Sequence, residues 1–268
     1  MPFIVCKFGG SSLAAGDRFL RVRDIIRSDP SRRAIVVSAP GRRDAKDEKI
    51  TDLLIRYFET GDEALWRAAE TRFLEIGETI GADAAPLLQE TREAILRKSS
   101  AAFAAGRGEY LSARLLARLL GFRFVDAMDC VRFTEGGTLD RAATRREMLH
   151  CLCGEPFVLP GFYGADAARR AFVFPRGGGD ITGALVAANL GADVYENWTD
   201  VDGVYDRDPA VDPRARRQRR LTYDQMESLA AAGANVLHPD SLRPAREESI
   251  PVHVRSSFLP RASGTWIT

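Results

Sequence analysis

The chain has 268 residues, of which 45% are hydrophobic, and 38 Lys and Arg residues nearly balance 37 Asp and Glu residues, which gives a formal net charge of +1. This length and composition predict a substantial buried core, either in one large α/β domain or in two lobes. Because the net charge creates no global field that would attract nucleic acid or an anionic membrane, we expect neither as a partner.

The N-terminus and the cysteines bear on the cellular location. The first residues, MPFIVCKFGG, lack a basic segment followed by a long apolar core, and no window approaches the roughly 20 apolar residues of a membrane span. Cys6, Cys130, Cys151 and Cys153 include no CxxC pair, which fits reduced thiols better than disulfides, so we expect a cytoplasmic protein. His150 lies beside two of these cysteines, but the segment is predicted to be helical, where residues two apart face different ways, and we expect no metal there.

The first predicted element is a buried strand, FIVCKF, which leads into the turn GGSSLA and then into an amphipathic helix from about residue 17 to residue 28. Lys7 lies near the end of this strand. Because burying an unpaired ammonium is costly, we expect Lys7 to face a negative group; a lysine that extends from the strand end into solvent is the alternative.

The second predicted strand, AIVVSAP at residues 34–40, carries Ser38 at its end and precedes the polar loop GRRDAKDEK. A helix is predicted to begin at Thr51, with Thr51 and Asp52 in its capping region. The order strand, glycine turn, helix and strand is typical of a parallel sheet that binds ligands at the carboxyl ends of its strands.

The middle of the chain is predicted to be mainly helical. From residue 52 to about residue 103 apolar residues recur three and four apart, which predicts helices that cover the sheet and indicates no chemical role. A further helix at residues 106–121 opens with Glu109, which either compensates the helix dipole or binds a ligand. There follow a strand at residues 122–127, a helix within TEGGTLDRAATRREMLHC, a strand at residues 156–164 that ends in a Pro-Gly-aromatic turn, and a short hairpin.

The stretch from Phe172 to Pro209 carries the strongest local signal. Three glycines, Gly177–Gly179, precede Asp180 and an apolar run at helical spacing. This pattern predicts a turn and a helix N-terminus that favours a phosphate or a carboxylate, and Arg176 adds a cation just upstream. A glycine triplet alone also occurs in ordinary flexible turns, so the matching glycine turn near the N-terminus strengthens the interpretation.

A second polar group follows the short strand signal at residues 193–195. Thr199, Asp200 and Asp202 fall in WTDVDG, where a strand end and a turn bring a hydroxyl and carboxylates together. Such a place suits a nucleotide ribose or a hydrated metal ion.

Eight sequence blocks, in order from about residue 3 to residue 268, resemble the catalytic domain of aspartate kinases in the amino acid kinase superfamily. The blocks are KFGGSSL, VVSAPG with TDLL after it, RGEYLS, PGFYG, RGGGDITGAL, ENWTDVDGVY with DP, GANVLHPDSLRPA and IPVHVRSSFLPRASGTWI. The resemblance implies an α/β fold, an αβα sandwich around a mostly parallel central sheet of about eight strands. It also implies a single catalytic domain over residues 1–268, with an N-terminal amino-acid-binding lobe at about 1–170 and a C-terminal ATP-binding lobe at about 171–268.

The implied activity is transfer of the γ-phosphoryl group of ATP to the β-carboxylate of L-aspartate, which gives 4-phospho-L-aspartate and ADP in the first step of lysine and threonine biosynthesis. Mg²⁺ is expected to arrive with ATP rather than to occupy a metal site made by the protein alone. The habit of the superfamily implies a homodimer. Two alternatives stay open: a kinase for another small amino acid or carboxylate, and a catalytically silent subunit that binds nucleotide or serves as a scaffold.

The resemblance also assigns residues. Lys7 and Asp180 match the catalytic positions: Lys7 would neutralise charge on the transferred phosphoryl group, and Asp180 would orient Lys7 rather than act as a base, because the aspartate nucleophile is already ionised. Arg176 would hold the substrate α-carboxylate and Glu109 its ammonium. The other matched positions are Ser38, Thr51, Phe162 and Gly179 for the amino acid, and Gly9, Gly10, Ser11, Thr199, Asp200 and Tyr205 for ATP. Retention of the four charged residues Lys7, Glu109, Arg176 and Asp180 argues against a silent subunit, because unpaired buried charges would cost stability.

Three positions depart from the family pattern. Asn235 stands where many aspartate kinases have a lysine that reaches the ATP phosphates, Ala210 stands where many have an arginine, and Gly179 replaces the serine of the usual GGSD loop. The first two remove positive charge, for which Arg214 or Arg216 is a candidate replacement, although a solvated basic loop is the simpler interpretation. The third removes a hydroxyl near the substrate carboxylate and keeps another acceptor open.

Aspartate kinases usually continue into paired ACT domains that bind small molecules, and this chain stops at Thr268. We therefore expect no ACT domain and no feedback inhibition by end-product amino acids through this chain alone. A separate regulatory subunit is the open alternative.

Overall fold

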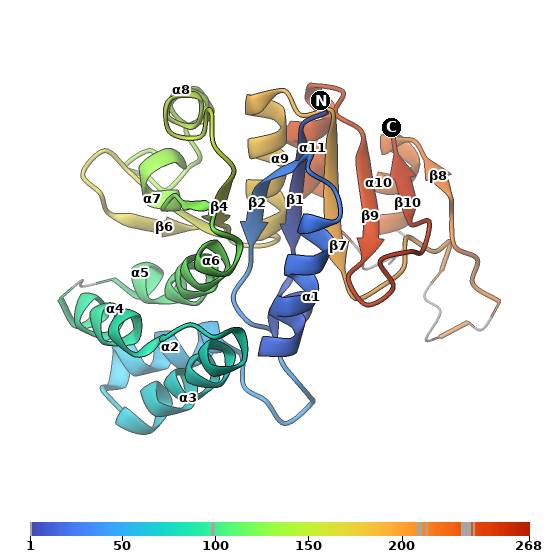
Figure 1. Ribbon diagram of the computed structural model, residues 1–268. Coiled ribbons are helices and arrows are strands. Elements are labelled where there is room, and N and C mark those ends of the chain that lie inside the picture. Colours follow the sequence, from blue (N-terminus) through green and yellow to red (C-terminus); the bar gives the residue numbers. More distant parts are fainter. Residues whose placement is uncertain (1, 98–99, 208–210, 213, 232–236, 238) are drawn as a thin grey trace.

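The computed structural model describes residues 2–268 except 98–99, 208–210, 213, 232–236 and 238. Its organising element is an eight-stranded sheet with the strand order β3-β4-β2-β1-β7-β9-β10-β8 (Figure 1). Neighbouring strands are parallel except β9 and β10. The strands are β1 (Ile4–Phe8), β2 (Arg32–Val37), β3 (Arg123–Phe124), β4 (Phe157–Pro160), β7 (Val194–Thr199), β8 (Arg220–Leu221), β9 (Val252–Ser256) and β10 (Thr265–Ile267).

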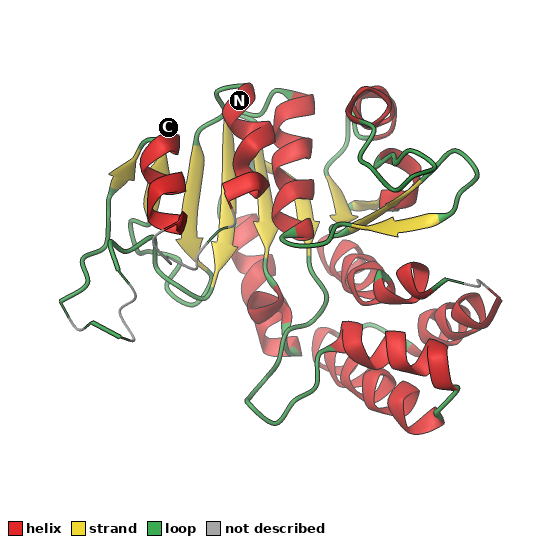
Figure 2. Cartoon of the chain, turned by 180° about the vertical axis from the view of Figure 1, so that it is seen from behind, coloured by secondary structure: helices red, strands yellow, loops and turns green. Residues whose placement is uncertain are grey.

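Helices pack against both faces of this sheet. Helix α1 (Gly16–Arg27) lies on one face, and α9 (Gly178–Leu190), α10 (Tyr223–Ala231) and α11 (Pro239–Glu247) lie on the other, which faces the reader in Figure 2. Strand β1 is buried at all five positions, as expected for a strand covered on both sides. The αβα arrangement and the mostly parallel sheet confirm the predicted fold class.

The segment predicted to be helical forms a separate group beyond the carboxyl ends of the strands (Figure 1). It contains α2 (Ile50–Thr60), α3 (Glu63–Ile80), α4 (Ala85–Arg97) and α5 (Ala101–Ala105), and α6 (Arg107–Leu120) connects it to β4. Helix α2 begins one residue earlier than predicted, at Ile50, and its N-cap Lys49 makes no side-chain capping hydrogen bond.

The 3₁₀ helix η1 (Gly10–Leu13) and α7 (Ala127–Cys130) were not predicted, and neither were α10 and α11, whereas α8 (Arg141–Cys151) was. The strand predicted at residues 156–164 is also divided. β4 ends at Pro160, and the chain turns at Phe162 before it enters the antiparallel hairpin of β5 (Tyr163–Ala165) and β6 (Ala171–Val173). The turn has a physical cause, because Phe162 has a φ of +78°, which no strand residue adopts.

The order of the sheet reverses next to β1, because β2 follows on one side and β7 lies on the other. In open parallel sheets, the crevice that binds ligands lies outside the carboxyl ends of the strands where this reversal occurs. Lys7 of β1 and Asn197 of β7 are paired in register at that point. The topology alone therefore singles out the neighbourhood of Lys7.

No helix in the described part of the chain combines the length and the apolar character that crossing a membrane requires.

Candidate active site

Lys7 forms an ion pair with Asp180 at the point where the strand order reverses. Lys7 Nζ lies 2.6 Å from Asp180 Oδ1, and the two side chains are 9% and 18% exposed. Asn197 donates from Nδ2 to the same oxygen at 2.7 Å. A single carboxylate oxygen therefore holds a lysine from β1 and an amide from β7. The structure confirms that Lys7 faces a negative group, and among the described residues its ammonium has no second ionic partner.

The turn after β1 is fastened to the turn after β2. Gly9 N–H donates to the carbonyl of Trp198 at 3.0 Å, and Gly41 N–H donates to the carbonyl of Gly10 at 2.8 Å. A Cβ at Gly10 would come within 2.9 Å of the Ala39 carbonyl oxygen, so a side chain at this position would push the two turns apart. The backbone beside Lys7 is therefore held in place from both neighbouring strands.

The glycine run before α9 lets three elements meet. A Cβ at Gly179 would lie 3.0 Å from Ser38 Oγ and 3.4 Å from Lys7 Cε, so the missing side chain gives the Ser38 hydroxyl and the lysine their room. Asp180 lies in the first turn of α9, where the helix dipole stabilises a carboxylate. The hydroxyl that a serine at position 179 would add has a neighbour in Ser38, which supplies a hydroxyl to the same space.

Phe162 lies against the start of α9 in a strained conformation. Its N–H donates to Thr182 Oγ1 at 3.2 Å, and a Cβ on Gly178 would come within 2.8 Å of the Phe162 Cα. A positive φ is uncommon for a bulky residue, and such strain clusters at functional sites. The turn at residues 161–162 thus joins β4 to the same site.

Glu109 is a buried carboxylate with one unpaired oxygen atom. It lies in the first turn of α6, is 6% exposed, and its Oε2 atom has no hydrogen-bond partner. Burial raises its pKa to about 7, against the opposing hydrogen bonds from the backbone of Ala39 and Glu109 and the charge of Arg107. No ion pair joins it to any described residue. Glu109 is therefore suited to receive a cation from a ligand.

Two predicted substrate residues are not fixed by contacts. Arg176 is exposed between β6 and α9, and Thr51 is half-buried in the first turn of α2. Neither side chain hydrogen-bonds or forms an ion pair with a described residue. They are available for a ligand, but the structure does not join them to the Lys7 network.

The residues predicted to bind nucleotide fall into two groups. Thr199 Oγ1 donates to Asp200 Oδ1 at 3.0 Å, and the Thr199 carbonyl accepts from Ser257 N–H at 2.9 Å. Ser257 in turn shares a 2.7 Å hydrogen bond with Ser12, so this group connects to the turn that contains Gly9, Gly10 and Ser11.

Tyr205 belongs to the second group. Its hydroxyl donates to Asp202 Oδ1 at 2.8 Å, and Arg217 lies 2.8 Å from Asp202 Oδ2. No contact in the described part of the chain joins this group to Lys7.

Two of the departures from the family pattern, Asn235 and Ala210, lie outside the described residues. Of the proposed replacements for their charge, Arg214 is exposed and lies 3.1 Å from Asp212, and Arg216 is exposed with its backbone N–H bonded to Asp206. Arg214 is thus already neutralised by a neighbour.

Arg72 has a structural task that the sequence interpretation missed. It is 5% exposed on α3, and Nη2 donates to the carbonyls of Gly41 at 2.5 Å and Ala14 at 3.2 Å, while Nη1 donates to that of Glu48 at 3.3 Å. It therefore anchors the turn after β2 that contacts Gly10. A signal was present, because Arg72 falls at helical spacing among the buried apolar residues of α3, where an arginine needs partners.

Asn197 was missed for a different reason. As a polar residue inside a buried strand it carried the same signal as Lys7, but its link to Asp180 depends on β7 lying next to β1.

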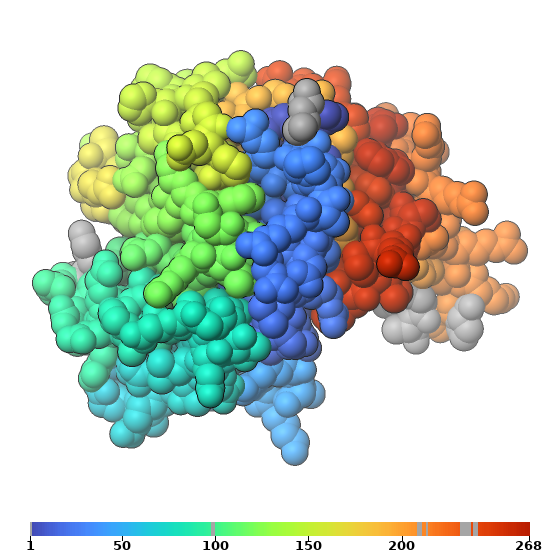
Figure 3. Space-filling view, viewed as in Figure 1, coloured from blue at the N-terminus to red at the C-terminus, as the bar shows by residue number. Residues whose placement is uncertain are grey.

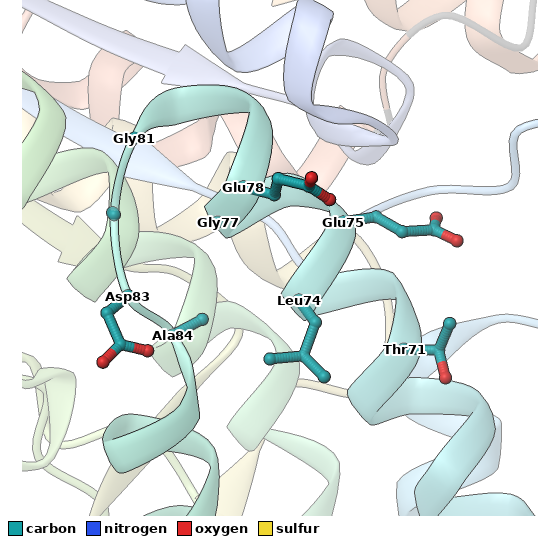
Figure 4. Close-up of a pocket in the computed structure, with 9 residues that line it drawn as sticks. Thr71, Leu74, Glu75, Gly77, Glu78, Gly81, Asp83 and Ala84 are labelled. Carbon is teal, nitrogen blue, oxygen red and sulfur yellow. The ribbon is translucent and has the colours of Figure 1, made fainter.

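A cavity of about 530 Å³ lies elsewhere, beside the end of α3 and the turn that follows. Figure 4 shows Leu74 and Glu78 of α3 and Asp83 of that turn among the residues that line it. Carboxylates repel phosphates and the carboxylates of an amino acid, so we do not place the substrates there. Among the described residues, no three His, Cys, Asp or Glu side chains are grouped to hold a metal ion.

Comparison with known proteins gives a family and close structural relatives. The sequence matches the amino acid kinase family over residues 2–256. It is 35% identical to aspartokinase 3 of Bacillus subtilis in an alignment that covers 97% of this chain and 62% of the relative.

Two solved structures are similar over nearly the whole chain. Aspartate kinase of Clostridium acetobutylicum has a TM-score of 0.93 and 35% identity, over 99% of this chain and 63% of its own. Aspartokinase III of Escherichia coli in complex with aspartate and ADP has a TM-score of 0.84 and 31% identity, over 99% of this chain and 64% of its own. The chain spans less than two thirds of the length of each of these relatives.

Proposed function

The chain belongs to the amino acid kinase family, and we propose that it transfers the γ-phosphoryl group of ATP to the β-carboxylate of L-aspartate, giving 4-phospho-L-aspartate and ADP. The observation that carries this proposal is the Lys7–Asp180 pair, 2.6 Å apart at the carboxyl ends of the strands and beside two glycine turns. The relative that was solved with aspartate and ADP, 31% identical to this chain, supports the choice of substrates.

Phosphoryl transfer requires positioning and charge neutralisation more than covalent chemistry. Lys7 neutralises the charge that develops on the transferred phosphoryl oxygens, with donor capacity left over from its bond to Asp180. Asp180, fixed by Asn197 Nδ2 at 2.7 Å, orients the lysine. No general base is needed, because the β-carboxylate of aspartate, with a pKa of about 4, is ionised at neutral pH.

The amino acid is proposed to bind between two charged groups, Glu109 and Arg176, that form no ion pair with a described residue. Glu109 receives the substrate ammonium at its free Oε2, and Arg176 holds the α-carboxylate as a two-pronged donor. Ser38, Thr51, Phe162 and Gly179 line this side of the site in the same proposal. In this proposal residues from 1 to about 170 form the amino-acid lobe and residues from about 171 to 268 the nucleotide lobe.

ATP is proposed to bind across the ends of β1 and β7. The turn with Gly9, Gly10 and Ser11 approaches the phosphates together with Lys7, and Thr199, Asp200 and Tyr205 contact the nucleoside. Mg²⁺ supplies further neutralisation of the phosphates when bound, and the exposed Asp200 carboxylate is a hard oxygen donor that fits an ion brought in by ATP. A homodimer and a cytoplasmic location stay predictions.

The test is trapping of the acyl phosphate with hydroxylamine. Purified protein with Mg·ATP is offered L-aspartate, L-glutamate or N-acetylglutamate in separate reactions, with the Lys7→Ala variant as the control. The proposal expects a hydroxamate signal with L-aspartate that depends on Lys7. A protein that binds ATP but gives no signal with any acceptor would contradict it and favour a silent subunit.

One observation favours a second candidate, a kinase for a different small carboxylate. Gly179 replaces the family serine, so the pocket has one hydroxyl fewer and more room than the pattern predicts. A signal with L-glutamate or N-acetylglutamate that exceeds the signal with L-aspartate would select this candidate.

A further inference from the structure

A pocket lined mainly by positively charged side chains lies on the sheet face opposite the Lys7–Asp180 pair. Its volume is about 260 Å³, and it is lined by residues of α1 and the residue after it, by Arg32 at the start of β2, Trp198 near the end of β7 and Arg255 of β9, and by the segment that follows β9. Figure 3 shows α1, in blue, directly beside the red β9–β10 segment on this face. The charged side chains that line it are Arg21, Asp24, Arg32, Arg255 and Arg261, and we call it the arginine pocket.

The charges of the arginine pocket do not balance. Four guanidinium groups line it against one exposed carboxylate, Asp24, which already lies 2.8 Å from Arg23. Glu196 is 4% exposed, does not line the pocket, and pairs with Arg32 at 2.8 Å and Arg255 at 2.9 Å. Even with Glu196 counted, positive charge is in excess, and an excess of fixed positive charge in a pocket concentrates anions.

Two arginines of the pocket, Arg21 and Arg261, neither hydrogen-bond nor form an ion pair with any described residue. The Arg21 guanidinium lies 5.1 Å from the ring centroid of Phe258, so stacking orients it while its N–H groups are left unused. Both groups are ready to donate to an oxyanion.

The floor of the pocket is rigid and partly apolar. Trp198 is 1% exposed, and the guanidinium carbons of Arg255 and Arg32 lie 4.3 Å and 5.3 Å from its ring centroid. Ile25 and Pro260 add apolar wall. The volume is below the range of about 300–1,000 Å³ that is usual for drug-sized ligands, so the fitting ligand is small.

The floor is joined directly to the catalytic side. Along β7, Trp198 lines the arginine pocket and Glu196 lies on the same face of the sheet, bonded to Arg32 and Trp198, whereas Asn197 between them bonds to Asp180 on the opposite face. The carbonyl of Trp198 also accepts the Gly9 N–H at 3.0 Å. A ligand that displaces the side chains of Arg32 and Arg255 would therefore shift β7, the strand that positions both Asn197 and the glycine turn after β1.

We propose that the arginine pocket binds a small organic anion through its carboxylate or phosphate group, and that occupancy changes the rate of phosphoryl transfer. The effect on the rate rests on the function proposed above, whereas the binding of an anion does not. The ligand is an effector rather than a substrate, because the central sheet lies between the arginine pocket and Lys7.

Binding is tested by calorimetric titration of the purified chain, without nucleotide or aspartate, at constant ionic strength. The probes are inorganic phosphate, glycerol 3-phosphate and succinate, which separate phosphate from carboxylate recognition. The Arg21→Ala/Arg261→Ala variant is expected to bind the preferred anion at least tenfold more weakly, a loss of about 1.4 kcal/mol or more. The charge-matched Arg67→Ala/Arg219→Ala variant, with two exposed arginines removed elsewhere, is expected to bind like the wild type.

The Lys7→Ala variant separates this pocket from the active site, and it is expected to retain the binding. Equal affinity in the wild type and in Arg21→Ala/Arg261→Ala overturns the proposal, as does loss of binding in Lys7→Ala or no binding of any of the three probes. The unfolding temperature of Arg21→Ala/Arg261→Ala is expected to match that of the wild type, because the two replaced side chains have no polar partners in the described part of the chain.

Coupling is tested by the initial rate of acyl phosphate formation with and without the preferred anion at saturation. The rate is expected to change in the wild type and to stay constant in Arg21→Ala/Arg261→Ala. An unchanged wild-type rate despite measured binding overturns the coupling. If the wild type forms no acyl phosphate at all, the proposed function fails, and the titration alone decides whether the pocket is an anion site.

Discussion

Strand β7 carries a charged network on each face, and the two networks differ in how completely their groups are paired. On the face of α9, Asp180 holds Lys7 and Asn197 through one oxygen. On the face of α1, Glu196 accepts hydrogen bonds from Arg32 at 2.8 and 3.2 Å and from Arg255 at 2.9 Å. Its carboxylate also accepts from Trp198 Nε1 at 3.0 Å and from Cys6 Sγ at 3.3 Å.

The consequence is visible in the electrostatics of Glu196. Burial alone would raise the pKa of this carboxyl group, but the hydrogen bonds and charges of Arg32 and Arg255 hold it below its usual value. Lys7 in contrast has one ionic partner among the described residues, and Glu109 nearby has none. In the Glu196 network one buried atom, Arg255 Nε, has no hydrogen-bond partner. Such a nearly complete network fixes the fold, whereas a network with more unused donors and acceptors keeps them for a ligand. Four predictions test this distinction.

The largest effect is expected on turnover from Lys7→Ala. Loss of the ammonium removes the positive charge at the developing phosphoryl oxygens, and kcat is expected to fall about 10³-fold, equivalent to ~4 kcal/mol. The free energy of unfolding is expected to change little, because Asp180 keeps its bond to Asn197 and is partly exposed. Steady-state assays and urea unfolding measure the two quantities, with the exposed Lys46→Ala as the control. Near-normal turnover would remove Lys7 from the mechanism.

The opposite pattern is expected for Glu196→Gln. The variant leaves the buried guanidinium of Arg32 and the partly buried one of Arg255 without a carboxylate, which is expected to lower the free energy of unfolding by about 3 kcal/mol. Turnover per folded molecule is expected to change far less than in Lys7→Ala, because Lys7 and Asp180 are both retained. Urea unfolding checks the loss against the exposed Glu135→Gln. A stable variant that has lost turnover would break the distinction between the two faces.

A smaller, selective effect is expected for Arg176→Ala. The guanidinium has no partner in the described part of the chain, so its removal leaves stability unchanged. Loss of a charged hydrogen bond to the α-carboxylate is expected to raise the KM for aspartate about thirtyfold, or ~2 kcal/mol, with little effect on the KM for ATP. Initial rates over a range of aspartate concentrations, with Arg219→Ala alongside, decide the matter; an unchanged KM would contradict the assignment.

The smallest effect is a dependence on pH that originates at Glu109. Burial raises its pKa from 4.5 to about 7, so between these values the folded protein holds a proton that the unfolded chain has lost. Its contribution to stability therefore falls as the pH rises through this window. Binding of the substrate ammonium needs the ionised form, and the KM for aspartate is expected to fall about tenfold from pH 6 to pH 8.

Glu109→Gln is the matched variant for this prediction. It is expected to have a KM for aspartate that is higher and that no longer changes over this pH range, and a free energy of unfolding that loses the corresponding slope. The same pH profile in wild type and variant would assign the dependence to another group.

The sequence was sufficient to predict the site residues that are marked by their immediate sequence neighbours. A lysine at the end of an apolar strand and an aspartate after a glycine run mark Lys7 and Asp180, and their neighbouring turns follow from the same patterns. The parallel sheet could be predicted because the order of strands, turns and helices can be read directly along the sequence.

What depends on contacts between distant segments could not be read this way. Asn197 contacts Asp180 only because β7 lies beside β1 in the sheet. The sequence of neither strand specifies which strand is its neighbour. Arg72 acts on carbonyl groups of distant turns, which carry no side-chain signal. Phe162 divides a predicted strand through a backbone conformation that its own side chain disfavours, so only the packing against α9 explains it.

The most direct test of the account is a double-mutant cycle on acyl phosphate formation with Lys7→Ala, Asp180→Ala and the combined variant. If Asp180 acts by holding Lys7, the two residues work as a unit, and the combined variant is expected to be about as slow as Lys7→Ala alone. Losses that multiply in the combined variant would show that the two residues act independently, and would contradict the central claim that one shared carboxylate oxygen organises the site.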